Sequence, residues 1–155
     1  MNNDQCKLCS LLPTLDPIFE TEHWKILLNQ DQGYLGRCFV TLKVHKSSLS
    51  EINDAEWLDF STAVKKLEKA LKQAFGASNF NWTCLMNNAY QEESATPHVH
   101  WHVRPRYSKS ITFSGLEFTD PEFGHHYNRE QRRKVEEDAL SAIKKEIQDN
   151  FGLRF

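Results

Sequence analysis

Between positions 97 and 107 the chain reads Pro97-His98-Val99-His100-Trp101-His102-Val103-Arg104-Pro105-Arg106-Tyr107. Successive side chains of a β-strand point to opposite faces. The alternation therefore predicts a strand that turns its valines and tryptophan into a core and lines up three imidazoles on the other face. Imidazoles on a rigid strand are suited to nucleophilic attack, proton transfer or metal binding near neutral pH. A tract of surface histidines without a role is the alternative interpretation.

Periodicities on both sides of this strand predict an α+β fold. Further strands are expected over residues 23–29, 37–44 and 80–87, with an irregular strand over 111–118. A long helix is expected to begin at an N-cap, Ser50 or Asn53, and to end at Gly76; a final helix is expected over about 128–150. The prediction is an antiparallel β-sheet of about five strands with one long central helix and a C-terminal helix.

Composition excludes several classes of protein. The 155 residues include 19 Lys and Arg against 21 Asp and Glu, a formal net charge of −2. The two signs are interspersed, so we expect no nucleic-acid partner. The first residues lack a basic segment followed by an apolar run, and no stretch is apolar enough to span a membrane. We therefore expect a cytoplasmic protein with no membrane partner.

Cys6 and Cys9 form a Cys-x-x-Cys pair near the N-terminus. In a reducing compartment such a pair more often binds metal than forms a disulfide. Spacing alone leaves a chance pair or a redox pair open, although a redox pair needs a strand–helix setting that the opening residues do not supply. A closed zinc site requires two further nitrogen or sulfur ligands. The candidates are His45 and one histidine of the alternating stretch.

Taken together, these residues resemble the histidine triad (HIT) superfamily of nucleotide hydrolases and nucleotidyltransferases. Residues 98–103 match its signature of three histidines separated by apolar residues, with Arg104 where a further apolar residue is expected. Residues 27–45 are similar to the nucleotide-binding hairpin of the family, with Leu42 in place of a proline. The resemblance covers about residues 6–107. It implies a single HIT-like domain over 1–155, with a zinc segment at 1–10, the core at 11–107 and a C-terminal extension at 108–155.

The resemblance also implies a role for each matched residue. His100 corresponds to the nucleophile that attacks an α-phosphate and carries the nucleotidyl group covalently, while its other ring nitrogen donates to a backbone carbonyl near the first histidine. His102 would contact the phosphate oxygens and help to protonate the leaving group. Asn29 matches a residue that bonds the ribose hydroxyls. Asn87 would orient the phosphate or the nucleophile.

A structural zinc ion and a homodimer follow from the same resemblance. The zinc-bearing branches of the superfamily bind the metal through the positions of Cys6, Cys9, His45 and His98. Four ligands close a tetrahedral site and leave no open position, so such a zinc would be structural. It would tie the N-terminal segment to the strand that carries His100.

Residues 93–97 depart from the family pattern. Many hydrolytic members have a Gly-Gln-Ser/Thr-Val stretch just before the triad, whereas this chain reads Glu-Ser-Ala-Thr-Pro. Either Ser94 or Thr96 is expected to substitute for the polar side chain that contacts the scissile phosphate.

The expected function is hydrolysis of a nucleotide at the α-phosphate with release of a nucleoside monophosphate. A dinucleoside polyphosphate, an AMP ester and a phosphoramidate all remain open as substrates. One alternative is nucleotidyl transfer to phosphate or a sugar phosphate, although His102 favours the hydrolases over the sugar-1-phosphate branch. Another is a zinc-containing nucleotide-binding module without catalysis. Arg104 and Arg106 either favour a phosphate-rich leaving group or form surface ion pairs.

Overall fold

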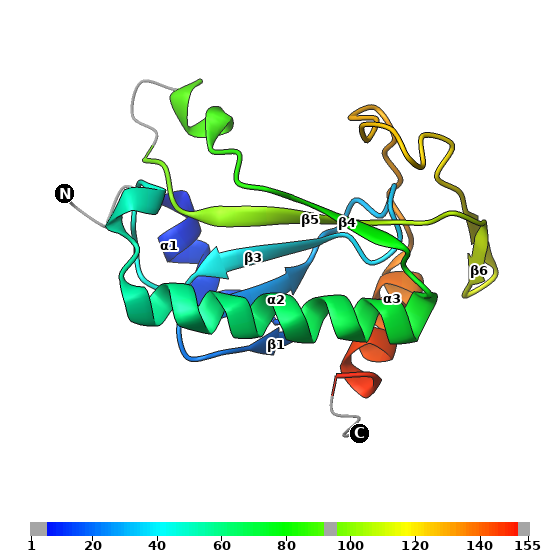
Figure 1. The fold of residues 1–155 in the computed structure, drawn as a ribbon, viewed down its shortest axis with the longest axis horizontal. Helices are drawn as coiled ribbons and strands as arrows, with labels where there is room; N and C mark the ends of the chain where they lie inside the picture. Colours follow the sequence, from blue (N-terminus) through cyan, green and yellow to red (C-terminus); the bar gives the residue numbers. More distant parts are fainter. Residues whose placement is uncertain (1–5, 92–95, 152–155) are drawn as a thin grey trace.

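In the computed structural model, which describes residues 6–91 and 96–151, five antiparallel strands form one sheet (Figure 1). The strand order is β1-β2-β3-β5-β4, and a separate hairpin pairs β6 with β7. The strands are β1 (Phe19–Glu20), β2 (Trp24–Leu28), β3 (Cys38–Leu42), β4 (Asn79–Thr83), β5 (His100–Arg106), β6 (Ile111–Phe113) and β7 (Leu116–Phe118). The predicted α+β fold with an antiparallel sheet is confirmed.

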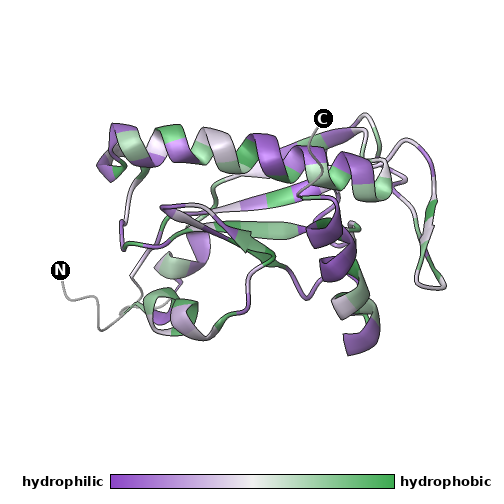
Figure 2. Ribbon diagram, turned by 90° about the horizontal axis from the view of Figure 1, so that it is seen from below, coloured by the Kyte–Doolittle hydropathy of each residue, from purple (hydrophilic) through white to green (hydrophobic). Residues whose placement is uncertain are grey.

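The residues that flank helix α2 (Asp54–Phe75) explain both of its boundaries. Of the two predicted N-caps, Asn53 is the one used, and it forms a capping box with Glu56. Gly76 ends the helix in the left-handed conformation, at φ 70°. Figure 2 shows hydrophilic and hydrophobic residues alternating along α2, as expected of a helix that packs one face on a sheet.

Three tryptophans from different strands fix α2 against one face of the sheet. The indole nitrogen of Trp24 in β2 donates to a backbone carbonyl of α2 at 2.8 Å. The indole nitrogen of Trp82 in β4 donates to Glu68 Oε1 at 2.9 Å. Trp101 in β5 stacks on Phe60, with ring centroids 5.1 Å apart. Trp101 therefore lies on the core side of the histidine strand, as the alternation predicts.

The remaining helices are short or lie near the ends of the chain. They are α1 (Lys7–Leu11), the 3-10 turns η2 (Leu12–Thr14), η3 (Leu49–Glu51) and η4 (Asn87–Tyr90), and α3 (Glu137–Asp149). The last helix buries Ala139, Ile143 and Ile147 on one face. Among the described residues, no helix combines the length and the apolar character needed to cross a membrane.

Three predicted boundaries differ from the structure. The histidine strand begins at His100, so His98 precedes it and the three imidazoles do not form one row. Strand β4 ends at Thr83, and the residues expected to extend it lead into η4. Helix α3 begins at Glu137, well after the expected start near 128. Residues 119–136, which we call the strap, instead make tertiary contacts.

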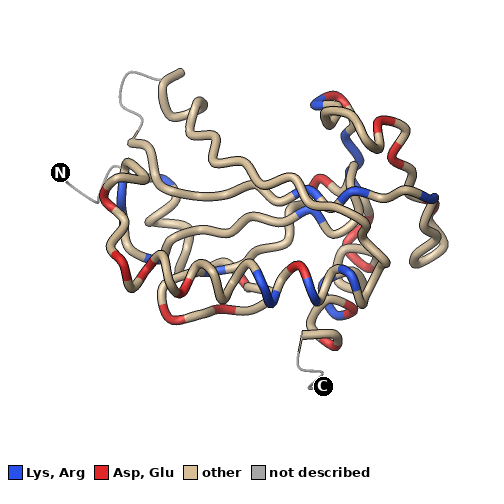
Figure 3. The backbone as a smooth tube through the Cα atoms, in the orientation of Figure 1, with Lys and Arg blue, Asp and Glu red and all other residues tan. Residues whose placement is uncertain are grey.

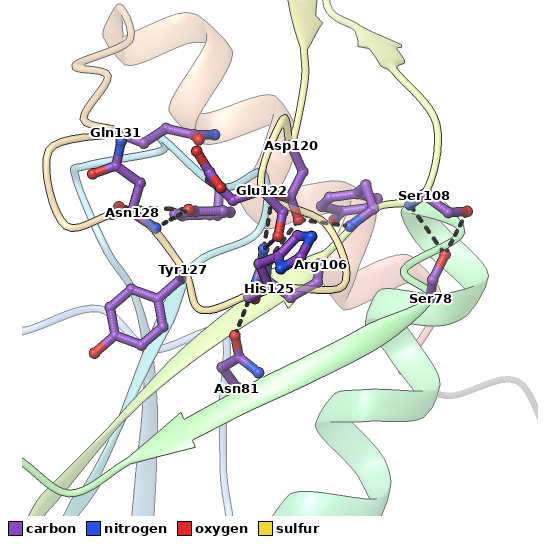
Figure 4. Close-up of polar contacts among 12 residues, drawn as sticks. Ser78, Asn81, Arg106, Ser108, Asp120, Glu122, His125, Tyr127, Asn128 and Gln131 are labelled. Carbon is purple, nitrogen blue, oxygen red and sulfur yellow. Dashed lines mark hydrogen bonds and ion pairs between the residues drawn. The ribbon is translucent and has the colours of Figure 1, made fainter.

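Arg106 anchors the first half of the strap (Figure 4). Its guanidinium forms two hydrogen bonds to Asp120, at 2.6 and 2.9 Å. It also donates to the backbone carbonyls of Glu122, at 2.7 Å, and His125, at 3.0 Å. Arg106 is only 2% exposed, so its ion pair is buried rather than on the surface. Removing one partner of a buried pair leaves an uncompensated charge, and the strap depends on this contact.

The second half of the strap packs on the loop between β2 and β3. The backbone nitrogen of Asn128 donates to the Tyr34 hydroxyl at 2.9 Å, and Gln131 Nε2 donates to the carbonyl of Gly33 at 2.8 Å. The backbone nitrogen of Arg133 donates to Asp31 Oδ1 at 2.9 Å. These bonds to a distant loop replace the first turns of the expected helix, because backbone groups committed to such partners do not form a helical ladder.

Gly36 lies where the β2–β3 loop meets α2, and it provides a test of this packing. Its φ is 74°, and an added Cβ would lie 2.6 Å from Leu71 Cδ2. Gly76 has a similar φ of 70° but no atom within 4 Å of an added Cβ. Gly76→Ala is therefore expected to cost about 1 kcal/mol of backbone strain. Gly36→Ala should cost about 2–4 kcal/mol, because overpacking adds to the strain. Urea unfolding measures both losses of stability, and equal losses would contradict the close packing of Gly36 against Leu71 of α2.

Candidate active site and metal cluster

His100 stands on β5 with its imidazole fixed by the backbone. Strand register pairs it with Thr41 of β3, on the face opposite Trp101. Its Nδ1 lies 2.8 Å from the carbonyl oxygen of His98, so Nδ1 carries the proton and donates it to that acceptor. The neutral ring then holds its lone pair on Nε2. A side chain held by its own strand in this way is oriented for nucleophilic attack without a carboxylate partner.

His102 lies two residues further along the same face. Its ring centroid is 5.0 Å from that of His100 and 4.9 Å from that of Phe39. Burial, followed by the charges of His100 and Arg104, lowers the pKa of His102 to about 4. Its buried Nδ1 has no hydrogen-bond partner among the described residues. In the free protein His102 is therefore a neutral imidazole at pH 7.

Both histidines line a cavity of about 570 Å³. This volume lies within the roughly 300–1,000 Å³ of small-molecule sites. Leu8 of α1 and Phe39 of β3 contribute apolar wall. The segment after β4 contributes Leu85, Met86 and the amides of Asn87 and Asn88. The cavity can therefore hold a ligand against an apolar wall with imidazole nitrogens beside it.

The structure brings most of the predicted binding residues to this cavity. Asn87 and Thr96 line it together with the histidines. Asn29 is not among the lining residues: it is 8% exposed, and its side-chain oxygen accepts from the backbone nitrogen of Asp31 at 2.8 Å. Ser94 lies outside the described residues. The roles assigned to these residues stay predictions, and the ribose contact of Asn29 has no geometric support.

The four predicted metal ligands meet in one cluster. The ligand atoms of Cys6, Cys9, His45 and His98 all lie within 4.8 Å of one another. His98 Nδ1 is 3.4 Å from the sulfur of Cys6 and 3.3 Å from that of Cys9. The sulfur of Cys9 is also 3.5 Å from His45 Nδ1. A zinc ion with tetrahedral sulfur and nitrogen ligands separates such atoms by about 3.6 Å, so the donor set fits zinc.

The surroundings of the cluster favour a metal over bare thiols. His98 Nε2 lies 2.7 Å from the carbonyl oxygen of Leu42, which fixes the proton on Nε2 and turns the Nδ1 lone pair toward the sulfurs. Burial and the neighbouring Cys6 sulfur raise the pKa of Cys9 to about 11. A cation between the sulfurs would displace their protons.

Three cavity residues had no basis in the sequence motifs. Lys7 and Leu8 line the cavity from α1. They stand between Cys6 and Cys9 in the sequence, but this position indicates a place in the cavity only when the cysteines are known to lie beside the histidines. Arg129 lines it from the strap. Nothing local in the sequence connects Arg129 to a histidine strand that lies more than twenty residues earlier.

Residues 15–109 match the family model described as the HIT domain. The chain is 27% identical over 116 residues to "Protein hit" of Bacillus subtilis, which covers 73% of this chain and 79% of that protein. A hypothetical histidine triad nucleotide-binding protein of Sulfolobus tokodaii has a similar structure, with a TM-score of 0.65 at 19% identity, over 94% of this chain and 91% of that one.

Two further solved structures are similar in fold. A zinc-bound histidine triad family protein from Mycobacterium smegmatis matches with a TM-score of 0.58 at 18% identity, over 96% of both chains. A uridylyltransferase mutant matches with a TM-score of 0.60 at 19% identity, over 95% of this chain and 48% of that one. At these identities the likeness shows a shared fold.

The depressed pKa of His102 predicts how stability depends on pH. Between pH 6.5 and about 4 the His102 imidazole is protonated in the unfolded chain but neutral in the folded protein. The free energy of unfolding therefore falls as the pH falls through this window. After allowance for solvent screening, the wild type should lose about 1–2 kcal/mol more than His102→Asn between pH 7 and 4.5. Urea unfolding at the two pH values measures this difference. Equal losses in both proteins would contradict the buried, neutral imidazole.

Proposed function

This chain belongs to the HIT family, and on that premise we propose that it hydrolyses a nucleotide at the α-phosphate through a nucleotidyl-His100 intermediate. The product would be a nucleoside monophosphate. The observation that carries the proposal is the hydrogen bond from His100 Nδ1 to the carbonyl of His98. It leaves Nε2 as the basic nitrogen of a ring that lines a ligand-sized cavity.

In the first step Nε2 of His100 attacks the α-phosphorus. A P–N bond forms, the P–O or P–N bond to the leaving group breaks, and the bonding electrons depart with that group. The proton on Nδ1 stays hydrogen-bonded to the carbonyl of His98, which stabilises the positive charge that develops on the ring. In the second step water attacks the same phosphorus, a P–O bond forms and the P–N bond to His100 breaks. The electron pair of that bond returns to Nε2, which restores neutral His100, and the water gives up a proton to solvent as the monophosphate is released.

His102 supports the first step in this proposal. It is neutral before substrate binds, because burial and neighbouring cations lower its pKa to about 4. An anionic phosphate beside the ring favours the charged form and raises that pKa. His102 would thus become able to donate a proton to the leaving group once the substrate is in place.

We also propose that Cys6, Cys9, His45 and His98 hold a structural zinc ion. The fit of the donor atoms and the bond from His98 to Leu42 support it. When bound, zinc would cross-link the N-terminal segment to His45, which follows β3, and to His98, which precedes the neighbouring strand β5. His98 would then act twice: its ring as a ligand and its carbonyl as the acceptor that orients His100.

Transfer of the nucleotidyl group to another acceptor is the second candidate. The similarity in fold to a uridylyltransferase mutant favours it. The covalent step is the same, and only the second acceptor differs. Products formed in water and in the presence of orthophosphate distinguish the two: nucleoside monophosphate for hydrolysis, and nucleoside diphosphate for transfer to phosphate.

Replacement of the nucleophile tests the proposed reaction. His100→Asn should lower AMP release from adenylated substrates by at least about 10³-fold, because the covalent route is lost. His126→Asn serves as the control, since His126 is exposed and does not line the cavity of the triad. Steady-state assays over a panel of dinucleoside polyphosphates, AMP esters and phosphoramidates measure both variants. Wild-type rates in His100→Asn would rule out the mechanism.

Metal analysis of purified variants tests the zinc cluster. Wild-type protein should contain about one zinc per chain, and Cys6→Ser or Cys9→Ser should lose most of it because a hard hydroxyl replaces a thiolate. Cys84→Ser, which changes a cysteine outside the cluster, should retain the metal. Full occupancy in the Cys6→Ser and Cys9→Ser proteins would exclude this ligand set.

A further inference from the structure

Arg104 is the first permanently charged residue along β5 after the two histidines of the active site. It stands where the triad signature has a further apolar residue. Residues two apart share a face of a strand, so Arg104 lies on the same face as His100 and His102. Figure 3 shows no acidic or basic residue along 96–103 and basic residues further along the same strand. The positive charge of β5 therefore begins directly beside His102.

A contact with β4 shows that the guanidinium of Arg104 leans back toward His102. Its Nη1 donates to the hydroxyl oxygen of Thr83 at 3.4 Å. In the register of β4 and β5, Thr83 is the cross-strand partner of His102, whereas the partner of Arg104 is Asn81. The Cβ atoms of directly paired residues lie about 5 Å apart. A guanidinium that reaches Thr83 therefore lies next to the His102 ring.

The strap holds this guanidinium in place. The centroid of the Tyr127 ring lies 4.2 Å from the guanidinium carbon of Arg104, within range of a cation–π contact. Arg104 is 7% exposed, and among the described residues its guanidinium forms no ion pair with an Asp or a Glu. The neighbouring Arg106, by contrast, is paired with Asp120. The charge of Arg104 is therefore shielded by little water and by no carboxylate in contact with it.

The other charged or titratable groups around His102 do not cancel this charge. On the same strand, before β3, and across the cavity they are cations or imidazoles: His100, Arg37, Lys7 and Arg129. Asp31 is the nearby carboxylate, and it forms an ion pair with Arg37. Beyond the end of β4 lies the thiol of Cys84, whose pKa burial raises, so it is uncharged at pH 7.

We infer that Arg104, held by Tyr127 of the strap, is a positioning residue that keeps His102 uncharged until an anion enters the cavity. The inference rests on the proposed function, in which His102 protonates the leaving group. A second positive charge beside the guanidinium is unfavourable in a site with little water. An anionic phosphate beside the ring offsets that charge, so His102 takes up its proton from solvent when the substrate binds. Burial, His100 and then Arg104 lower the pKa of His102 in the free protein, which agrees with this order of events.

Neither Arg104 nor Tyr127 lines the cavity, so neither is placed to contact a substrate there. Any effect of these two residues on proton transfer must pass through His102. Loss of the Arg104 charge should raise the pKa of His102, whereas loss of a merely structural contact should leave that pKa unchanged. A change of about one pKa unit is the size expected for one neighbouring charge.

NMR titration of the histidine rings tests the inference in the free, zinc-containing protein, and His102→Asn identifies the resonance of His102. A pKa of about 4 leaves about 3% of the His102 rings protonated at about pH 5.5. Arg104→Gln should raise this pKa by about one unit, which protonates about a quarter of the rings at the same pH. Tyr127→Leu, which exposes the guanidinium to water, should produce a smaller rise.

Two variants serve as controls for this titration. Arg104→Lys keeps the positive charge and should stay close to the wild-type pKa of His102. Lys109→Gln removes an exposed cation beyond the end of β5 and should match the wild type. Zinc content and urea unfolding are measured for each protein. If Arg104→Gln folds poorly, Arg104→Leu, which restores an apolar residue of the triad signature, makes the same test.

The pH profile of kcat tests the same residue during turnover. The proton donor must be charged in the complex with substrate, so kcat falls as the pH rises through the pKa of His102 there. Arg104→Gln should move this alkaline limb upward by about one pH unit, and Arg104→Lys should return it toward the wild-type position. If Arg104 served folding alone, its loss would lower kcat at every pH without moving the limb.

The outcomes separate this inference from the function on which it rests. An equal His102 pKa in the wild type and in a folded, zinc-containing Arg104→Gln protein overturns the inference and leaves the hydrolase proposal intact. An equal pKa in Tyr127→Leu overturns the part assigned to the strap. A wild type that releases no nucleoside monophosphate overturns the hydrolase proposal, and the NMR titration still decides whether Arg104 controls the charge of His102.

Discussion

His98 is the residue on which the candidate active site depends. Its backbone carbonyl accepts the hydrogen bond that orients His100, and its ring nitrogen Nδ1 faces the two cysteine sulfurs. The other nitrogen of the ring contacts the carbonyl of Leu42 at the end of β3. One residue thus links the N-terminal cysteines, the hairpin and the nucleophile. A displacement of the cluster would move the His98 carbonyl, and the orientation of the His100 ring would change with it.

The strap has a comparable structural role at the other end of the sheet. Arg106 and Asp120 form a buried ion pair, and backbone bonds to the β2–β3 loop complete the attachment. Because these contacts join the strap to the sheet and to the β2–β3 loop, the strap packs as part of the domain. It contributes Arg129 to the cavity and places Tyr127 over Arg104. The C-terminal extension therefore bears on the active site although it carries none of the histidines.

Much of the fold was predictable because its signals are local. Apolar periodicity, the cap at Asn53 and the stop at Gly76 define α2, and period-two alternation places Trp101 in the core. For the cluster, the residues alone indicated the two cysteines, His45 and one histidine of the triad, and the resemblance to the zinc-bearing branches of the superfamily implied the full set that the structure assembles. What was not predictable depends on contacts between distant segments. The late start of α3 follows from bonds around the β2–β3 loop, and the side chain of Asn29 bonds within that loop and does not line the cavity; no local pattern encodes either feature.

Trapping the covalent intermediate is the direct test of nucleophilic attack by His100. Protein mixed with diadenosine tetraphosphate is quenched with base during turnover, since phosphohistidine survives base, and is then examined by intact-mass spectrometry and peptide mapping. We expect one adenylyl group per chain at most, located on His100 Nε2. Steady turnover with no adduct, or with an adduct on another residue, would contradict it.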